Sequence, residues 1–209
     1  VLPQPRLIVF GFPYPRFTLP NTPIDTVMDI AEVEFIAEKE LITIVPNFGH
    51  PKFLMIGGDF GPFKPGIPVE VPLWMGINMK QSHKCKIVCP DWMDVQKLED
   101  LKEQELNNRL FIQMPDHFIV IAQLLISTAS EDIPNSEEVK MLIKDIWDIR
   151  NSKLRASVDA FIKSGGTHAR LDHLTLFEIH GIRPLLTRAL NKLDRLGQVS
   201  SETMSQTPD

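Results

Sequence analysis

The sequence is poor in the features that mark secreted, membrane or nucleic-acid-binding proteins. Its only cysteines, Cys85 and Cys89, lie too close together to build a disulfide framework, which favours a reducing compartment. No run of about 18 apolar residues occurs, so no membrane helix is expected. The formal net charge is −5, whereas a dedicated nucleic-acid binder usually carries a basic face on a basic domain. Because 43% of the residues are apolar, the remaining expectation is a globular protein with a packed core.

Motifs for catalysis are also missing. Asp59-Phe60-Gly61 is spelled like the magnesium-binding triplet of protein kinases, but the His-Arg-Asp catalytic loop and upstream glycine loop of a kinase do not occur. We instead expect Gly57 and Gly58 to supply positive φ angles in a tight turn between strands. No serine, cysteine or threonine stands in a recognisable nucleophile elbow, and no phosphate-binding glycine loop is found. The sequence therefore predicts a protein that is not an enzyme.

A metal or cofactor site is not expected either. His83, Cys85 and Cys89 offer three ligand side chains, but structural zinc sites usually pair cysteines twice, and no second pair exists. Ordinary buried or half-buried thiols explain both cysteines better. Three later histidines are spaced unsuitably for sharing one helical face, and we interpret them as surface or packing residues: His168, His173 and His180.

The first 27 residues differ in composition from the rest. They hold six of the 17 prolines and begin with Val1 rather than Met. Their only apolar run, Leu7 to Phe12, is broken by proline and does not fit a secretory signal. We expect Met28 to be the natural start and residues 1–27 to be a non-native or disordered extension. The alternative is a genuine, disordered, proline-rich arm.

Residues 28–72 are predicted to form a small β-containing domain. Acidic and spaced apolar residues from Met28 to about Glu40 indicate a short helix. Three strand-like stretches follow, separated by turn signals rich in Gly, Pro and Asn: 41–45, 53–56 and 69–71. A domain of about 45 residues buries too little core to be stable alone, so we expect it to pack against the rest of the chain.

Residues 73–197 are predicted to form an all-α domain, followed by a polar, disordered tail at 198–209. The longest helix begins at Asn135, which has a capping-box spacing to Glu138, and ends at Gly165-Gly166. Nearly 30 residues make a rod of about 45 Å. The other helices are predicted at 73–82, after Asp91, at 118–128 and from Pro184 to Gly197. The predicted fold class is α+β: a small N-terminal β-rich domain, then a larger helical domain with one long helix.

A helix this long exposes more surface than a small domain can cover, which favours a protein partner. Tryptophan beside arginine is common in binding hot spots, although tryptophan is more often a core residue. Two basic runs, at 80–86 and 150–155, leave open a DNA-binding accessory protein as the alternative. A charged face that meets solvent or an acidic partner is the commoner explanation of such runs.

Several blocks of sequence, in order, resemble one protein family: 31–38, 56–63 (Ile-Gly-Gly-Asp-Phe-Gly-Pro-Phe), 69–74 (Val-Glu-Val-Pro-Leu-Trp), 90–95, 129–134, 143–150 (Ile-Lys-Asp-Ile-Trp-Asp-Ile-Arg) and 171–176. The chain resembles the Psf-two-type subunits of the eukaryotic GINS complex from about Met28 to Leu196. Where relatives often read Trp-Leu-Ala, this chain has Trp74-Met75-Gly76. Gly76 inside a helix costs about 1 kcal/mol relative to alanine.

The resemblance implies a function as well as a fold. GINS subunits each combine a helical domain with a small β domain, and in this family the β domain comes first. The family forms a nuclear heterotetramer with Sld-five, Psf-one and Psf-three subunits, which joins the MCM ring and the forty-five-type Cdc protein in the replicative helicase. The resemblance thus implies a non-catalytic scaffold without cofactor or metal, whose contact with DNA is at most indirect. Candidate partner-interface residues are Trp74, Trp147, Arg150, Leu154, Leu190 and Leu193.

Overall fold

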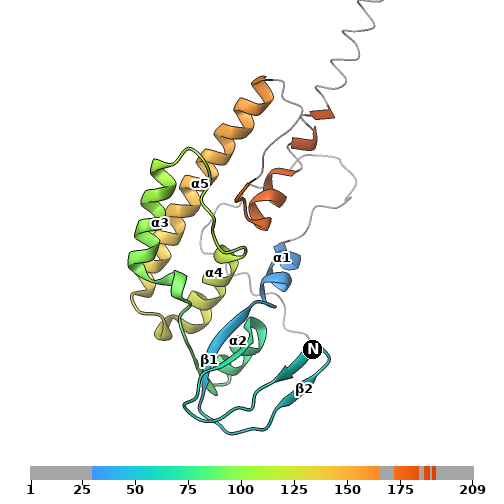
Figure 1. The fold of residues 1–209 in the computed structure, drawn as a ribbon, viewed down its shortest axis with the longest axis vertical. Coiled ribbons are helices and arrows are strands. Elements are labelled where there is room, and N and C mark those ends of the chain that lie inside the picture. Colours follow the sequence, from blue (N-terminus) through green and yellow to red (C-terminus); the bar gives the residue numbers. More distant parts are fainter. Residues whose placement is uncertain (1–29, 165–171, 184–185, 189, 192–209) are drawn as a thin grey trace, which may run out of the picture.

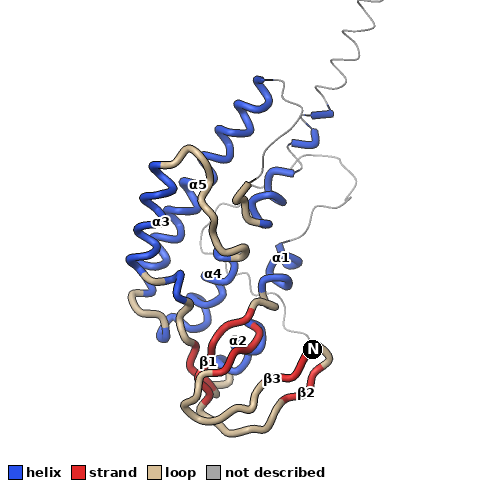
Figure 2. The backbone as a smooth tube through the Cα atoms, viewed as in Figure 1, coloured by secondary structure: helices blue, strands red, loops and turns tan. Residues whose placement is uncertain are grey.

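The computed structural model describes residues 30–164, 172–183, 186–188 and 190–191. Within them the chain forms two units, with the strands gathered at one end and the long helices at the other (Figure 2). The predicted extension at 1–27 and the predicted tail at 198–209 lie outside the described residues. The elements in chain order are α1 (Ile30–Ala37), β1 (Leu41–Pro46), β2 (Phe53–Met55), β3 (Gly58–Phe60), β4 (Val69–Pro72), α2 (Leu73–Gln81), β5 (Cys85–Ile87), η1 (Asp91–Met93), α3 (Val95–Asn107), α4 (Phe118–Ala129), η2 (Ser130–Asp132) and α5 (Ser136–Ser164).

A three-stranded antiparallel sheet with the order β4-β1-β5 forms the base of the N-terminal unit. The β-branched residues of β1 suit a strand, and their alternation buries Ile42 and Ile44 on one face. α2 packs closely on this face, because a Cβ at Gly76 would lie 2.6 Å from Ile42 Cδ1. Gly76 thus permits a close helix–strand approach that a larger residue would obstruct.

The sequence predicts a β-containing domain that ends at residue 72, but the sheet continues beyond it. Its third strand is β5, in which Ile87 lies opposite Ile44 of β1. α2 is therefore an insertion between two strands of one sheet and belongs to the N-terminal unit. Three residues are too few to show a strand period, which is why the sequence pattern missed β5.

The separate β2–β3 hairpin was predicted only in part. Its first strand and a tight turn at Gly57 and Gly58 were expected, whereas its second strand, β3, which places Phe60 opposite Phe53, was not. Gly58 and Gly61 adopt positive φ angles of 134° and 109°. The positive φ angle expected at Gly57 is not found. The hairpin stands at the outer end of the N-terminal unit (Figure 1).

The long helix is confirmed: α5 spans 29 residues, Ser136–Ser164. The capping at Asn135 differs in detail from the expected box. The carbonyl of Asn135 accepts hydrogen bonds from the amides of Glu138 and Val139, at 2.9 and 3.0 Å, while its side-chain amide donates to Glu138 Oε2 at 3.3 Å. The predicted end at Gly165-Gly166 lies outside the described residues.

A helical segment at 176–183 was not predicted. Thr175 and Glu178 form a capping box at its start, since the Thr175 amide donates to Glu178 Oε2 at 2.8 Å and the Glu178 amide donates to Thr175 Oγ1 at 3.4 Å. The spacing Thr-x-x-Glu was a readable signal. Of the helix predicted from Pro184, residues 186–188 and 190–191 are helical, and the rest lies outside the described residues.

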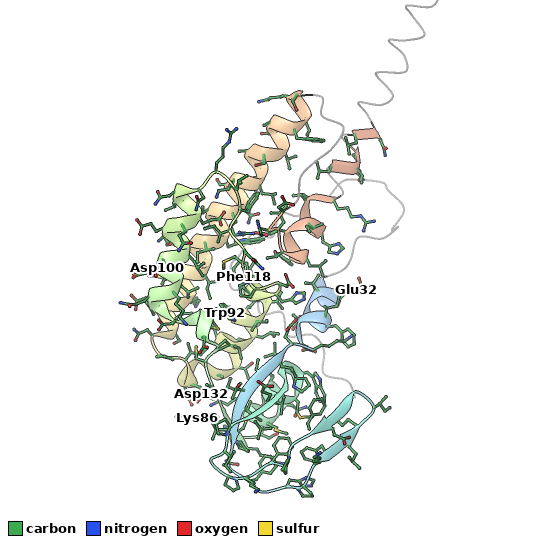
Figure 3. The ribbon with its side chains drawn as sticks, viewed as in Figure 1. Glu32, Lys86, Trp92, Asp100, Phe118 and Asp132 are labelled. Atoms are coloured by element: carbon green, nitrogen blue, oxygen red, sulfur yellow. The ribbon has the colours of Figure 1, made fainter. Side chains whose placement is uncertain are left out.

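One hydrophobic core joins the two units. It includes Ile44 and Leu73 from the sheet unit together with Phe118, Leu125 and Ile146 from α4 and α5. Figure 3 labels Phe118 inside this packing, and Asp132 beside Lys86 at the junction of the units. The small β unit therefore obtains its core from the helical unit, as its size requires.

Candidate partner-binding surfaces

Three of the residues predicted to contact a partner are buried inside the chain itself. Trp147, Arg150 and Leu154 of α5 have exposed fractions of 4%, 0% and 5%. Their assignment to a partner interface is therefore corrected, because these side chains cannot reach a partner in this conformation. Trp74 is 38% exposed, Leu190 is half-buried, and Leu193 lies outside the described residues.

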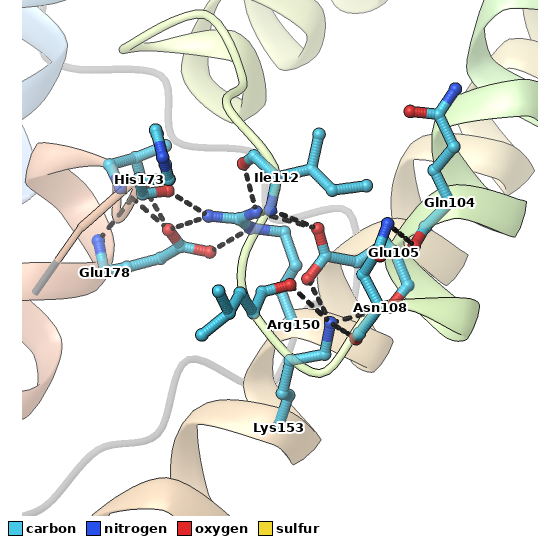
Figure 4. A network of polar contacts seen from close by, with 10 residues as sticks. Gln104, Glu105, Asn108, Ile112, Arg150, Lys153, His173 and Glu178 are labelled. Atoms are coloured by element: carbon cyan, nitrogen blue, oxygen red, sulfur yellow. Dashed lines mark hydrogen bonds and ion pairs between the residues drawn. The ribbon is translucent and has the colours of Figure 1, made fainter.

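Arg150 is the centre of a buried polar network (Figure 4). Its Nε and Nη2 donate to the two carboxylate oxygens of Glu178 at 2.6 and 2.8 Å. Nη1 donates to Glu105 Oε2 at 3.1 Å and to the carbonyl of Ile112 at 3.0 Å, and Nη2 also donates to the carbonyl of His173 at 2.9 Å. All five N–H groups of the guanidinium are thus used.

Lys153 balances the charge of this network. Its Nζ donates to Glu105 Oε1 at 2.7 Å and to the carbonyl of Asn108 at 2.9 Å. Two cations therefore face two buried carboxylates. Burial lowers the pKa of Arg150, but the hydrogen bonds and charges of Glu178 and Glu105 more than compensate and raise that pKa above its usual value. Arg150 is thus a structural cation that joins α3, α5 and the segment 172–183.

Apolar contacts seat the segment 172–183 on α5. The ring of Phe177 lies 5.4 Å from that of Trp147, centroid to centroid. Ile182 packs with Leu154 and Val158 in a second, smaller cluster. This cover explains why the apolar stripe of α5 is buried without a partner. Sequence reasoning missed Glu105 and Glu178, although Glu105 follows Leu98 by seven residues, which places it on the buried face of α3.

The basic runs are largely engaged within the chain. Arg150 and Lys153 are held in the buried network, so of the second run only Arg155 has an exposed cationic side chain. In the first run, Lys80 Nζ lies 2.7 Å from Asp132 Oδ2. His83, Lys84 and Lys86 stay exposed. A continuous basic surface that spans both runs is therefore not formed.

Asp132 links the two units. Besides pairing with Lys80 of α2, its Oδ2 accepts a hydrogen bond from the Ile87 amide of β5 at 2.9 Å. The carboxylate is almost fully buried, and it accepts a hydrogen bond from an amide on the outer edge of the sheet. An edge strand is thereby protected from pairing with another chain.

A group of exposed apolar residues lies where α1, β1 and α2 meet, and we call Phe35, Leu41 and Trp74 the α1–α2 patch. The Trp74 amide donates to the Glu38 carbonyl at 3.1 Å, and the Leu73 amide donates to the Glu40 carbonyl at 2.8 Å. These bonds hold the elements together, and all three patch side chains are exposed. Exposed apolar side chains on neighbouring elements are candidates for an interaction surface.

The candidate metal and catalytic residues do not assemble into a site. Among the described residues, no group of three or more His, Cys, Asp or Glu side chains is arranged to hold a metal ion. Cys85 is buried, and its thiol donates to the Gly76 carbonyl at 3.7 Å. Burial raises the pKa of Cys85 to about 11. Asp59 and Phe60 lie in strand β3.

None of the described helices is long and apolar enough to cross a lipid bilayer.

Comparison with known proteins identifies the family. Residues 29–88 match the family described as PSF2 N-terminal domain, and residues 92–197 match the GINS complex protein helical bundle domain. The chain is similar to the DNA replication complex GINS protein PSF2 of Homo sapiens, with 51% identity over 81% of this chain and 92% of that protein. It is 49% identical to the Xenopus laevis protein of the same description over 81% of this chain and 92% of that protein. A probable PSF2 protein of Drosophila melanogaster is 48% identical over 86% of this chain and 89% of that protein. This chain therefore belongs to the PSF2 family of GINS complex subunits.

Proposed function

We propose that this chain is a non-catalytic structural subunit of a GINS complex and acts in DNA replication. The observation that carries the proposal is the ordered match of both units, at 29–88 and 92–197, to the two GINS family descriptions. Its nearest partners would be the Sld-five, Psf-one and Psf-three subunits of a heterotetramer. The tetramer would join the MCM ring and the forty-five-type Cdc protein in the nucleus, where the ring supplies the motor activity.

The α1–α2 patch is the surface that best fits a sister subunit. Phe35 and Trp74 are both exposed aromatic side chains on helices, and tryptophan is a frequent anchor of interfaces. Three side chains are only the centre of an interface, which needs about 800 Å² on each partner. The residues around them would complete it.

Co-expression with the three presumed sister subunits tests this proposal. We expect the full chain to enter a 1:1:1:1 complex, measured by light scattering after gel filtration. Trp74→Ala should weaken that complex, and it should cost the chain less free energy of unfolding than Trp147→Ala does, because Trp74 is partly exposed. Trp147→Ala should instead cost about 3–5 kcal/mol of stability.

Two results would contradict the proposal at different levels. A monomer that ignores all three subunits would remove the scaffold function itself. A complex that tolerates Trp74→Ala without loss of affinity would remove only the assignment of the α1–α2 patch.

The DNA-binding alternative is not favoured by the geometry, because Lys80, Arg150 and Lys153 are engaged in intramolecular ion pairs. The exposed basic residues that remain in the first run are His83, Lys84 and Lys86. Direct binding through them would weaken steeply with salt and would be lost on reversing Lys84 and Lys86 to glutamate. We expect no such binding by the isolated chain and at most indirect contact with DNA in the complex.

A further inference from the structure

The buried apolar stripe of α5 is interrupted once by a charged side chain. Apolar residues recur along the helix at three- and four-residue steps, and Arg150 takes the position between Trp147 and Leu154. The apolar packing divides at the same place. Trp147 belongs to the main hydrophobic core, whereas Leu154 and Val158 belong to the separate, smaller cluster with Ile182. Along α5 the buried polar network of Arg150 therefore lies between two clusters.

Three pieces of the chain meet in the smaller cluster, and we call them together the outer unit. They are the loop 108–112, the C-terminal half of α5 at 151–164, and the segment 172–183, which we call the strap. The loop contributes the partly buried ring of Phe111, and Lys153 Nζ holds it through the Asn108 carbonyl at 2.9 Å. Figure 1 shows that this half of α5 extends beyond the end of α3. The outer unit thus lacks the cover that α3 gives to the first half of α5.

The strap is attached to α5 largely through polar groups. Its buried side chains are Thr175, Glu178 and Ile182, of which only Ile182 is apolar. Glu178 pairs with Arg150, and Arg150 Nη2 also donates to the His173 carbonyl at 2.9 Å. A buried ion pair adds little net stability, because the lost hydration of the two charges offsets their attraction. The attachment is therefore specific in geometry but modest in strength.

This division of the core predicts two levels of stability in one chain. Regions that share few buried apolar contacts with the main core can open as cooperative units without global unfolding. The main core joins the sheet to α2, α4 and the first half of α5, whereas the smaller cluster holds three buried side chains among the described residues. Opening of the outer unit should therefore cost less free energy than unfolding of the whole chain.

We propose that the strap and the C-terminal half of α5 open together as one unit while the main core stays folded. Opening would separate the strap from α5 and uncover the apolar side chains of Leu154 and Val158. The strap thus controls whether this half of α5 presents a polar or an apolar surface. The device belongs to the single chain and does not depend on the proposed function.

Thiol labelling at two positions of α5 tests the proposal in the full chain. In a parent with Cys85→Ala and Cys89→Ala, Val158→Cys places a thiol in the outer unit. Val139→Cys is the matched control, because Val139 is a buried valine of the same helix in the main core. The probe is dithiobis(nitrobenzoate), which reacts with a thiol only when it is uncovered. We expect Val158→Cys to react at least about tenfold faster, with a weaker dependence on urea because local opening exposes less surface.

Two core substitutions in these thiol variants separate local from global opening. Leu125→Ala weakens the main core, so it should accelerate labelling of Val139→Cys about tenfold or more and leave Val158→Cys unchanged, because Leu125 stays packed when only the outer unit opens. Ile182→Ala weakens the smaller cluster and should accelerate labelling of Val158→Cys. Hydrogen exchange by mass spectrometry on the unaltered chain is the second measurement, and the strap should exchange faster than α4.

Several outcomes would overturn the proposal. Equal labelling rates with equal urea dependence would mean that both thiols are uncovered by one global transition. The same conclusion would follow if Leu125→Ala accelerated both thiols equally, or if the strap exchanged as slowly as α4. Fast labelling of Val158→Cys that Ile182→Ala leaves unchanged would show that the end of α5 frays by itself, and the strap would then control nothing.

Discussion

Arg150 and Glu178, which are 28 residues apart in the chain, form a two-pronged ion pair with both side chains almost completely buried. This pair fastens the segment 172–183 onto α5. The same guanidinium reaches Glu105 at the end of α3. A buried ion pair contributes little net stability compared with an apolar replacement of both partners, but removal of one partner is costly because it leaves the other charge unpaired.

Arg150→Met should therefore destabilise the chain strongly. It leaves Glu178 buried without a cation and leaves Glu105 with Lys153 alone. We expect a loss of about 3–5 kcal/mol in the free energy of unfolding, measured by urea denaturation. Lys102→Met is the control, since Lys102 pairs with Asp145 in a much more exposed setting, and the expected loss is below about 1 kcal/mol. Equal effects of the two variants would refute the central role of Arg150.

Gly76→Ala should destabilise the chain although alanine is the better helix former. The added methyl group would lie 2.6 Å from Ile42 Cδ1 and 3.3 Å from Ile44 Cγ2. Overpacking a core costs about 1–3 kcal/mol, which outweighs a helix-propensity gain of about 1 kcal/mol. Gly181→Ala is the matched control because it also lies in a helical segment and its Cβ would meet nothing within 4 Å. Thermal unfolding should show a lower Tm for the first variant and an equal or higher Tm for the second. A stabilised Gly76→Ala would mean that β1 and α2 separate easily.

Asp132→Ala should loosen the junction of the two units. The change leaves the Ile87 amide without its acceptor and Lys80 without its partner. An unsatisfied buried donor costs about 1–3 kcal/mol. Hydrogen exchange by mass spectrometry should show faster exchange in β5, while Asp145→Ala should leave β5 unchanged. If β5 exchanged at the parent rate in both variants, Asp132 would not stabilise the sheet edge.

Cys85 should be almost inert to alkylation at neutral pH. Burial is the main reason that its pKa rises from 9.0 to about 11, and the thiolate is the reactive form. In a Cys89→Ser variant, iodoacetamide labelling followed by mass spectrometry should increase about tenfold per pH unit from pH 8 toward pH 10. Fast labelling at pH 8 in the folded chain would contradict this burial, and urea should abolish the protection.

The same shift predicts how stability depends on pH. Because the folded thiol holds its proton more tightly than the unfolded one, its contribution is fully present below about pH 9 and is lost as the pH rises toward 11. The variant Cys85→Ala removes this titration. Its free energy of unfolding should therefore fall less steeply than that of the parent across this range.

Elements with a strong local pattern were predictable from the sequence. The long helix α5 and the apolar helix α4 lie close to the expected ranges, and so does β1. β5 and the helical segment at 176–183 were missed for different reasons. β5 is a strand only because β1 offers it a partner, whereas the segment at 176–183 carried a capping signal at Thr175 and Glu178 that was overlooked.

The sequence by itself determined the order of the two units, the length of α5 and the family, since local periodicity and ordered motifs depend on neighbours along the chain. Only the tertiary structure decided which side chains are available to a partner. Trp147, Arg150 and Leu154 have the composition of a binding hot spot, yet the segment 172–183 covers them. Trp74 and Leu54 stay exposed. Exposure depends on contacts between residues that are distant in the chain, and no local pattern records those contacts.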